Sequence, residues 1–330
     1  MPGGGVRTHG CRGRSLRAAA CHPAAPRQAR TATPWPAGAS PGRSHRGRSG
    51  IHRSARWGPT PSGGGVLLKK GVCLVTVPGA SLEERLAAAR DAGYQGVEPS
   101  LGRPGQGPLA LDAPREAVQA VRDAARARGL EIPSVMGAGA YVIHPDPTER
   151  TQAIQNLRRA LQVAAWLGAR DVLLHPGQLQ PSMRYDWAFD ALLSALRDLK
   201  PEAEALGVGI AVENVWNKFL LSPREARELV DAVGSPLIGV YFDVGNYVPW
   251  AYPAQWIRIL GRRIRKVHVK DFQRRVGTIE GFCQLLDGDA DYPEVMRALR
   301  EIGYDDYLTS EVEGDIAETS RRLDRILTLA

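Results

Sequence analysis

The chain has 330 residues, with 43 Lys and Arg against 35 Asp and Glu, which gives a net charge of +8. Residues 1–65 hold eleven arginines and no Lys, Asp or Glu, so the rest of the chain is slightly acidic. The basic pI therefore describes this first segment rather than a binding face, which argues against nucleic acid as a partner. No apolar run approaches the length that crosses a bilayer, and no secretory h-region precedes a cleavage site, so we expect no membrane association and a soluble domain.

Residues 1–65 are rich in Gly, Pro, Ala, Ser and Arg and have few branched aliphatic residues. Such a segment buries too little apolar surface to offset the entropy of ordering, so its composition predicts a disordered extension. Three origins compete: translation from a mis-assigned upstream start, an organelle transit peptide, and a nucleic-acid-binding arm. The many prolines weigh against the second origin, and the lack of interleaved aromatic residues weighs against the third.

The four cysteines show no paired spacing, since two lie in the extension and two are far apart: Cys11, Cys21, Cys73 and Cys283. This arrangement argues against a disulfide framework and against a cysteine-rich zinc site. It fits a protein of the reducing cytoplasm.

From Lys70 onward, a short β-branched run, a turn and an amphipathic helix recur in order. The runs are 71–77, 96–98, 131–136, 171–175, 209–213, 237–243, 264–270 and 307–312. The intervening helices are predicted to stop at glycines, because the residue past a helix end often adopts a positive φ. These glycines are Gly93, Gly129, Gly168, Gly207, Gly234, Gly261 and Gly303.

Helix starts are also readable. Ser81 with Glu84 has the spacing of a capping box. Asp146-Pro147 and Ser222-Pro223 place proline at the first helical position, where its missing N–H costs nothing. Residues 149–167 carry an apolar stripe of helical period.

Strict alternation of apolar strands and helices predicts a parallel sheet covered by helices, an α/β fold. Eight units in roughly 260 residues match a (β/α)8 TIM barrel. A doubly wound sheet is the rival, but the segment after the first run has one glycine and no dinucleotide fingerprint. We therefore predict a barrel over residues 66–330, preceded by the disordered basic tail of residues 1–65.

Active sites in such barrels lie at the carboxyl ends of the strands. The last four predicted strands each place one metal-capable side chain there: Glu213, Asp243, His268 and Glu311. A single buried charge of this kind could belong to a salt bridge, but four in succession favour a metal site. Three carboxylates and one imidazole suit Mn2+ or Mg2+, with Co2+ or Zn2+ as alternatives.

Several blocks carry a family resemblance: residues 69–79, 210–223, 239–248, 252–272 and 285–312. They resemble the xylose isomerase-like barrel superfamily, and within it the sugar phosphate isomerase/epimerases of the L-ribulose-5-phosphate (L-xylulose-5-phosphate) 3-epimerase type. The likeness covers residues 66–330 and none of the extension. It implies that Glu213, Asp243, His268 and Glu311 hold one divalent metal and that Glu213 and Glu311 move protons. It also implies that self-association into a homo-oligomer is an option.

The residues themselves indicate a compatible reaction. Moving a carbonyl, or inverting a carbon beside it, requires removal of a weakly acidic proton, and a metal that binds the carbonyl and hydroxyl oxygens stabilises the enediolate. Strands five and eight are three apart in a ring of eight, so Glu213 and Glu311 should approach a ketose or ketose phosphate from different sides. Opposed bases suit epimerisation.

The sixth-strand block departs from many superfamily members. They have Asp-x-x-His, whereas this chain has Asp243-Val-Gly-Asn246. Asparagine is a poor metal ligand, so a multinuclear zinc site of the DNA-repair endonuclease kind is disfavoured. The DVGN form does occur in the phosphosugar epimerase-like branch.

Five further residues are predicted to contact substrate: Glu98, His175, Trp216, Asn246 and Lys270. Four of them also have a structural interpretation: Glu98 could form a buried pair, His175 could be a hydrogen-bonded histidine, Trp216 could close the core, and Lys270 could balance the carboxylates. Glu313 is a second candidate ligand on the eighth strand, and Asp271 is predicted to orient His268.

Two other functions remain open. A dehydratase of an inosose-type polyol ketone would use the same metal and the same proton abstraction, and a non-catalytic sugar-binding barrel would need neither base. Arg274 and Arg275, in the loop after the seventh strand, could bind a substrate phosphate or be solvated loop charges.

Overall fold

The computed structural model describes residues 68–137 and 141–329, so the predictions for residues 1–65 lie outside the described residues. Eight parallel strands form one sheet: β1 (Lys69–Cys73), β2 (Gly96–Glu98), β3 (Ser134–Met136), β4 (Asp171–Leu174), β5 (Gly209–Glu213), β6 (Ile238–Asp243), β7 (Ile264–Val269) and β10 (Tyr307–Ser310). Each of the eight predicted runs overlaps one of them, although β1 begins at Lys69, before its predicted run of 71–77.

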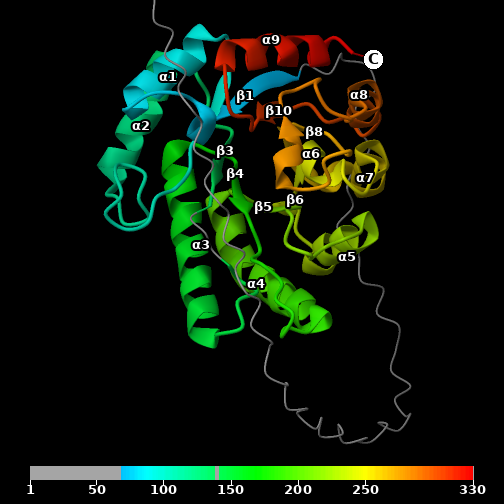
Figure 1. Ribbon diagram of the computed structural model, residues 1–330. Coiled ribbons are helices and arrows are strands. Elements are labelled where there is room, and N and C mark those ends of the chain that lie inside the picture. The colour runs from blue at the N-terminus through cyan, green and yellow to red at the C-terminus, as the bar shows by residue number, and fades with distance from the viewer. Residues whose placement is uncertain (1–67, 138–140, 330) are drawn as a thin grey trace, which may run out of the picture. The chain divides into compact units, whose positions relative to one another are not determined.

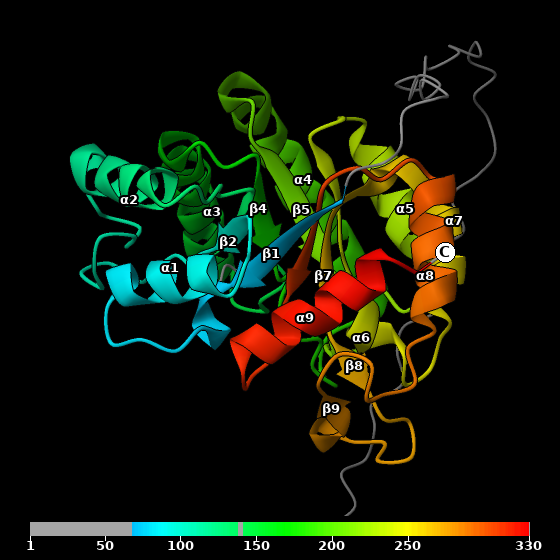
Figure 2. The same ribbon diagram turned by 90° about the horizontal axis from the view of Figure 1, so that it is seen from above.

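A long helix follows each strand of this sheet. They are α1 (Leu82–Asp91), α2 (Arg115–Ala127), α3 (Pro147–Leu167), α4 (Tyr185–Leu206), α5 (Pro223–Val233), α7 (Pro253–Leu260), α8 (Tyr292–Glu301) and α9 (Ile316–Leu327). Figure 1 shows α3 and α4 side by side, and Figure 2 shows the helices outside the strands. The short helix α6 (Val244–Tyr247) follows β6 directly.

The strand order is β2-β1-β10-β7-β6-β5-β4-β3. Parallel bridges between Gly96 and Glu131 and between Ser100 and Met136 join the two ends of this order. The sheet is therefore a nearly closed TIM barrel, as predicted, and β5 and β10 are three strands apart in the ring.

The predicted helix caps are present. The Ser81 hydroxyl accepts a hydrogen bond from the Glu84 N–H, and the Glu84 carboxylate accepts from the Ser81 N–H, which completes the capping box. Asp146 and Ser222 cap α3 and α5, each followed by proline at the first helical position. All seven predicted stop glycines have a positive φ, for the steric reason given above.

The main apolar core lies between the sheet and the helices, and a smaller cluster of Leu173, Ala211 and Tyr241 lies apart from it. On β4, β5 and β6 these three alternate with core residues, so they face the barrel interior. Tyr307 fits beside Gly96, where an added Cβ would collide with its ring. Polar residues fill much of the remaining interior.

Two local features differ from the sequence prediction. The run 71–77 ends as a strand at Cys73, and the next residues form a 3-10 turn, Leu74–Thr76, in which Val75 is exposed. An antiparallel pair, β8 (Asp271–Phe272) with β9 (Phe282–Cys283), was not predicted. Strands of two residues carry too little periodicity to be recognised.

No helix in the described part of the chain has the length and apolar character needed to span a membrane.

Replacing Ser81 by alanine should lower the free energy of unfolding by about 1 kcal/mol, because the Glu84 N–H loses its acceptor at the start of α1. Urea unfolding of both proteins, followed by circular dichroism, measures the difference. Ser81→Thr keeps the hydroxyl and should retain most of the stability. Equal midpoints for wild type and Ser81→Ala would contradict a stabilising role for this cap.

Candidate metal centre

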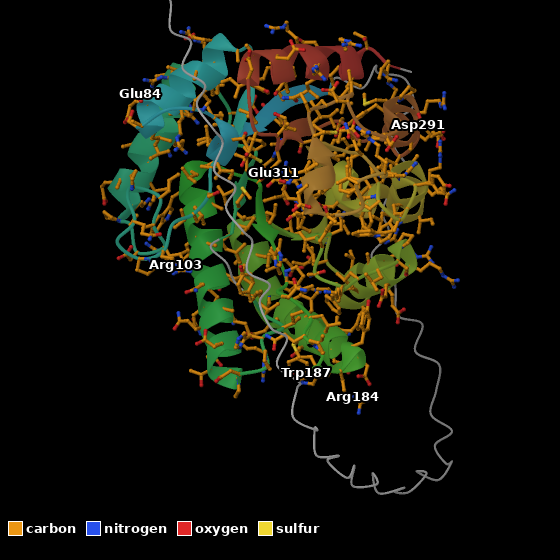
Figure 3. The ribbon with its side chains drawn as sticks, viewed as in Figure 1. Glu84, Arg103, Arg184, Trp187, Asp291 and Glu311 are labelled. Carbon is orange, nitrogen blue, oxygen red and sulfur yellow. The ribbon has the colours of Figure 1, made fainter. Side chains whose placement is uncertain are left out.

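The four predicted ligands converge at the carboxyl ends of adjacent strands. Glu213 ends β5, Asp243 ends β6, His268 is the penultimate residue of β7, and Glu311 follows β10. One ligand atom from each lies within 4.8 Å of the others. Figure 3 shows Glu311 among the strand ends, whereas the other five labelled side chains lie at the periphery.

The strands deliver these side chains at staggered heights rather than at one level. Asp243 pairs with His268, but Glu213 pairs with Tyr241, two residues before Asp243. The stagger follows from the tilt of barrel strands. Glutamate, with one more methylene than aspartate, lets the flanking strands reach the same point.

The Nδ1 atom of His268 faces all three carboxylates. It lies 3.3 Å from Glu213 Oε1, 3.7 Å from Glu311 Oε2 and 3.9 Å from Asp243 Oδ2. His268 and Asp243 have no exposed surface, and Glu213 is 7% exposed. The acidic groups are thus held close together with little water to screen them.

Lys270 supplies a positive charge to this cluster. Its Nζ lies 2.8 Å from Asp243 Oδ2 and 2.6 Å from Glu311 Oε2. The proximity of Asp243 and Glu311 helps to raise the pKa of Lys270 despite its burial. Lys270 therefore balances the carboxylates, which was one of its two predicted roles, and its side chain remains 15% exposed.

Burial and the neighbouring charges shift the pKa values of these three carboxylates. Burial, together with the nearby Glu311 and Asp243, raises the pKa of Glu213 to about 7. Burial likewise raises the pKa of Asp243, although Lys270 opposes this. For Glu311, burial is outweighed by His268 and Lys270, which lower its pKa.

This donor set fits a divalent cation. Asp243 Oδ1 accepts a hydrogen bond from the Asn246 N–H at the start of α6. Asp243 Oδ2 is buried, and its partner is the Lys270 ammonium, which it shares with Glu311 Oε2. One ammonium does not balance three carboxylates that are shielded from water, and a cation held by Glu213, Asp243, His268 and Glu311 would offset the remaining negative charge. Oxygen-rich coordination suits Mn2+ or Mg2+.

A hydrogen-bonded set lies on the opposite side of the imidazole. His268 Nε2 is 2.6 Å from Glu98 Oε2 and 3.4 Å from Cys73 Sγ, and the Tyr241 hydroxyl donates to Glu98 Oε1 over 2.7 Å. Burial disfavours the Glu98 anion, but His268 outweighs it and lowers the pKa of Glu98 to about 2. Glu98 has no exposed surface and forms a buried pair with His268, which was its structural interpretation.

In the described residues, Cys73 and Cys283 are free thiols. Cys73 lies against the same histidine that the carboxylates face. Cys73 is the last residue of β1. Its neighbour Val72 belongs to the outer apolar core, so Cys73 points to the opposite face, into the barrel interior.

Two asparagines fix the ends of β5 and β6. Asn214 accepts a hydrogen bond from the Asp243 N–H and donates to the Asp243 carbonyl. Asn246 donates through its side chain to the Asn214 carbonyl. Asn246 was predicted to contact substrate, but its side chain is buried and its amide is engaged here, so it holds the backbone that presents Glu213 and Asp243.

Trp216 lies in an aromatic group near the mouth. Its ring contacts Trp250, Phe272 and Phe282 at centroid distances of 5.1–5.3 Å, and its Nε1 donates to the Asn246 carbonyl. Lys270 Nζ is 5.1 Å from the Phe282 ring centre, which joins this group to the acidic cluster.

Three other residues named from the sequence lie outside the ligand cluster. His175 follows β4, is partly buried, and accepts a hydrogen bond from the Gly177 N–H. Glu313 is exposed and outside the ligand cluster. Asp271 does not orient His268, because its carboxylate accepts from the N–H groups of Phe272, Leu286 and Ala290.

Arg274 is engaged with the protein rather than pointing to the cluster. Its Nε donates to the Val248 carbonyl, and its N–H donates to Asp289. Arg275 donates to Gln273. The positions of Arg274 and Arg275 therefore match the prediction of loop charges, the second of the two interpretations given above.

Sequence reasoning missed Cys73, Tyr241, Asn214 and Ser134 as members of the site. Period-2 alternation, extended back from each ligand, would have found Tyr241, which lies two residues before Asp243 on the same strand face. The contacts of Cys73 and Ser134 depend on which strands are neighbours, which no local pattern contains.

A family described as xylose isomerase-like TIM barrel matches residues 86–327. The 2-epi-5-epi-valiolone 7-phosphate 2-epimerase of Actinoplanes sp. is 31% identical over 200 residues, which cover 59% of this chain and 68% of that protein. The L-ribulose-5-phosphate 3-epimerase UlaE of Salmonella heidelberg is 26% identical over 226 residues, which cover 67% and 78%.

The match to the uncharacterized protein MJ1311 of Methanocaldococcus jannaschii, at 28% identity, spans only 57% of that protein and 49% of this chain. Among solved structures, a D-tagatose 3-epimerase-like protein superposes with a TM-score of 0.67 at 23% identity. It covers 79% of this chain and 97% of that one. This likeness supports the barrel fold.

Mn2+ should stabilise the protein once chelator-treated protein is dialysed free of chelator. A free concentration a hundred times Kd adds about 2.7 kcal/mol, which raises Tm by roughly 5–10 °C. Differential scanning calorimetry measures the shift. Asp243→Asn should lose most of it, whereas Glu313→Gln, on the exposed side of the same rim, should keep it. An unchanged Tm for wild type would contradict the metal centre.

Proposed function

This chain belongs to the xylose isomerase-like TIM barrel family, and from that premise we propose that it is a divalent-metal-dependent isomerase or epimerase of a ketose or ketose phosphate. The observation that carries the proposal is the convergence of three carboxylates and an imidazole, from four adjacent strands, within 4.8 Å. Two of the carboxylates come from strands three apart in the ring. The two epimerases compared above, from Actinoplanes and Salmonella, are both named for phosphorylated substrates.

Glu213, Asp243, His268 and Glu311 are the residues that would hold the cation, Mn2+ by preference, with Mg2+, Co2+ or Zn2+ as alternatives. When bound, the cation supplies Lewis acidity to the substrate oxygens beside the carbon that loses its proton. The buried position of His268 and Asp243 keeps water from competing for that position.

The two glutamates carry the proton transfers. Glu213 on β5 and Glu311 beyond β10 lie on either side of Asp243 and His268, so a substrate seated over these residues has one carboxylate toward each face. One carboxylate removes the proton beside the carbonyl, and the other, in its acid form, returns a proton to the opposite face. Inversion at that carbon is the result, which favours epimerisation over a one-base isomerisation.

Lys270 and Trp216 are the residues that we propose for substrate contact. Lys270 Nζ sits next to Glu311 and remains partly exposed, so its ammonium can face the negative charge that develops on the substrate oxygens. Trp216 offers an aromatic face to the C–H side of a sugar. His175, just after β4, lies on the rim across the ring from β10.

Glu213→Gln and Glu311→Gln should each abolish inversion, with turnover falling about 10²–10⁴-fold. Each variant should still catalyse exchange of solvent deuterium into one epimer, and the two variants should act on different epimers, because one base remains on one face. NMR of ketoses and ketose phosphates incubated in D2O with Mn2+ follows inversion and exchange together.

Glu313→Gln, which removes an exposed carboxylate from the same rim, is the control and should behave as wild type. Near-wild-type inversion in both Glu213→Gln and Glu311→Gln would refute the two-base assignment. Loss of water from the substrate instead of inversion would favour a dehydratase of a polyol-derived ketone. Chelator-insensitive binding without exchange, across the whole panel, would favour a sugar-binding barrel.

A further inference from the structure

Glu98 is an acidic residue in the barrel interior that the proposed proton transfers do not use. It ends β2, has no exposed surface, and places Oε2 2.6 Å from His268 Nε2. The imidazole therefore lies between two acidic groups: Glu98 on its Nε2 side and the ligand cluster on its Nδ1 side.

Glu98 is itself held in place by neighbouring strands. Its Oε1 accepts from the Tyr241 hydroxyl over 2.7 Å, and Ser134 Oγ lies 3.3 Å from the same hydroxyl. Cys73 Sγ donates to Glu98 Oε2 over 3.2 Å. The Tyr241 ring also packs against the His268 ring, with centroids 4.3 Å apart. The carboxylate has no freedom to swing away from the histidine.

This geometry determines which imidazole nitrogen carries the hydrogen. A neutral imidazole donates from one nitrogen and accepts at the other, and an ionised carboxylate only accepts. With Glu98 at Nε2, the N–H lies at Nε2 and the Nδ1 lone pair points to Glu213, Asp243 and Glu311. Carboxylates placed behind ligand histidines orient the ring and raise its basicity.

We propose that Glu98, held by Tyr241, is a positioning residue that fixes the tautomer and orientation of His268, so that Nδ1 faces the cation. The inference rests on the proposed function, since it requires a cation at the ligand cluster. β6 then serves the site twice: Asp243 contacts the cation directly, and Tyr241, two residues earlier, secures the support of His268.

A second metal site offers another interpretation of the same atoms, because Cys73, Glu98 and His268 also offer three ligand atoms within 4.8 Å. The distances favour a hydrogen bond. Ligand atoms held about 2.0–2.1 Å from a tetrahedral ion lie more than 3 Å apart, whereas Glu98 Oε2 and His268 Nε2 are 2.6 Å apart.

Metal affinity gives the first test, independent of turnover. Calorimetric titration of the full-length chain with Mn2+ should show one site, and Glu98→Gln should weaken its affinity about 10–100-fold. Tyr241→Phe should weaken it in the same direction by a smaller factor. Asp171→Asn is the matched control: it removes another buried carboxylate, paired with Lys266 and Arg265 at the amino ends of the strands. It should lower Tm without changing Kd.

The tautomer itself gives a second test that needs no variant of Glu98. In protein with 15N-labelled histidine and loaded with Zn2+, which is diamagnetic, the His268 spectrum should show the hydrogen on Nε2. Comparison with His268→Gln identifies its signals among the seven histidines. A hydrogen on Nδ1 would overturn the proposal, even if Glu98→Gln fails to fold.

The outcomes distinguish this inference from the proposed function. Wild type that binds no divalent cation would overturn both. Wild type that binds one cation, with unchanged affinity in Glu98→Gln and Tyr241→Phe, would overturn the positioning role alone. Two bound cations, reduced to one by Cys73→Ser, would replace it with the second metal site.

Discussion

Three carboxylates crowd around one imidazole in a part of the barrel from which water is largely excluded, and the electrostatic cost of that arrangement constrains the rest of the structure. Like charges at these distances repel strongly where the effective dielectric is low. His268 and Lys270 compensate part of the negative charge, and Lys270 pairs with both Asp243 and Glu311. A site of this kind persists only if the strands that present it are held firmly.

The fold supplies that rigidity by separating two functions in space. The apolar core lies outside the strands, against the surrounding helices, and provides the stability of the domain. The interior is therefore free to hold polar groups, and several of these bond to groups on other strands. Asn214 and Asn246 tie the ends of β5 and β6 together, while Glu98 and Tyr241 support the side of His268 that faces away from the ligands. Displacement of one strand end would therefore move several of the candidate ligands.

In the proposed function, substrate selection would fall to the rim rather than to the four candidate metal ligands. Lys270 connects the acidic cluster to Phe282 and so to Trp216, which places a positive charge beside an aromatic surface. That combination suits a polar, oxygen-rich molecule with a C–H face. The short pair β8 and β9, which carries Phe272 and Phe282, adds a feature to the seventh loop that the repeating strand and helix units do not supply. Variation in such loops lets one barrel serve different substrates.

The sequence by itself determined the barrel, the order of its units and the four strand-end candidate ligands, because these follow from local periodicity, from glycine and capping positions, and from charged residues where strands should be apolar. Only the tertiary structure decided what lies behind and around those ligands. Glu98, predicted to contact substrate, proved to be buried against His268, and Asn246 proved to bond the backbone. Cys73 and Tyr241 come from strands distant in sequence, and strand tilt staggers the heights of the four candidate ligands. Contacts across a closed ring depend on neighbour order, register and side-chain length together, and no segment of the sequence encodes these alone.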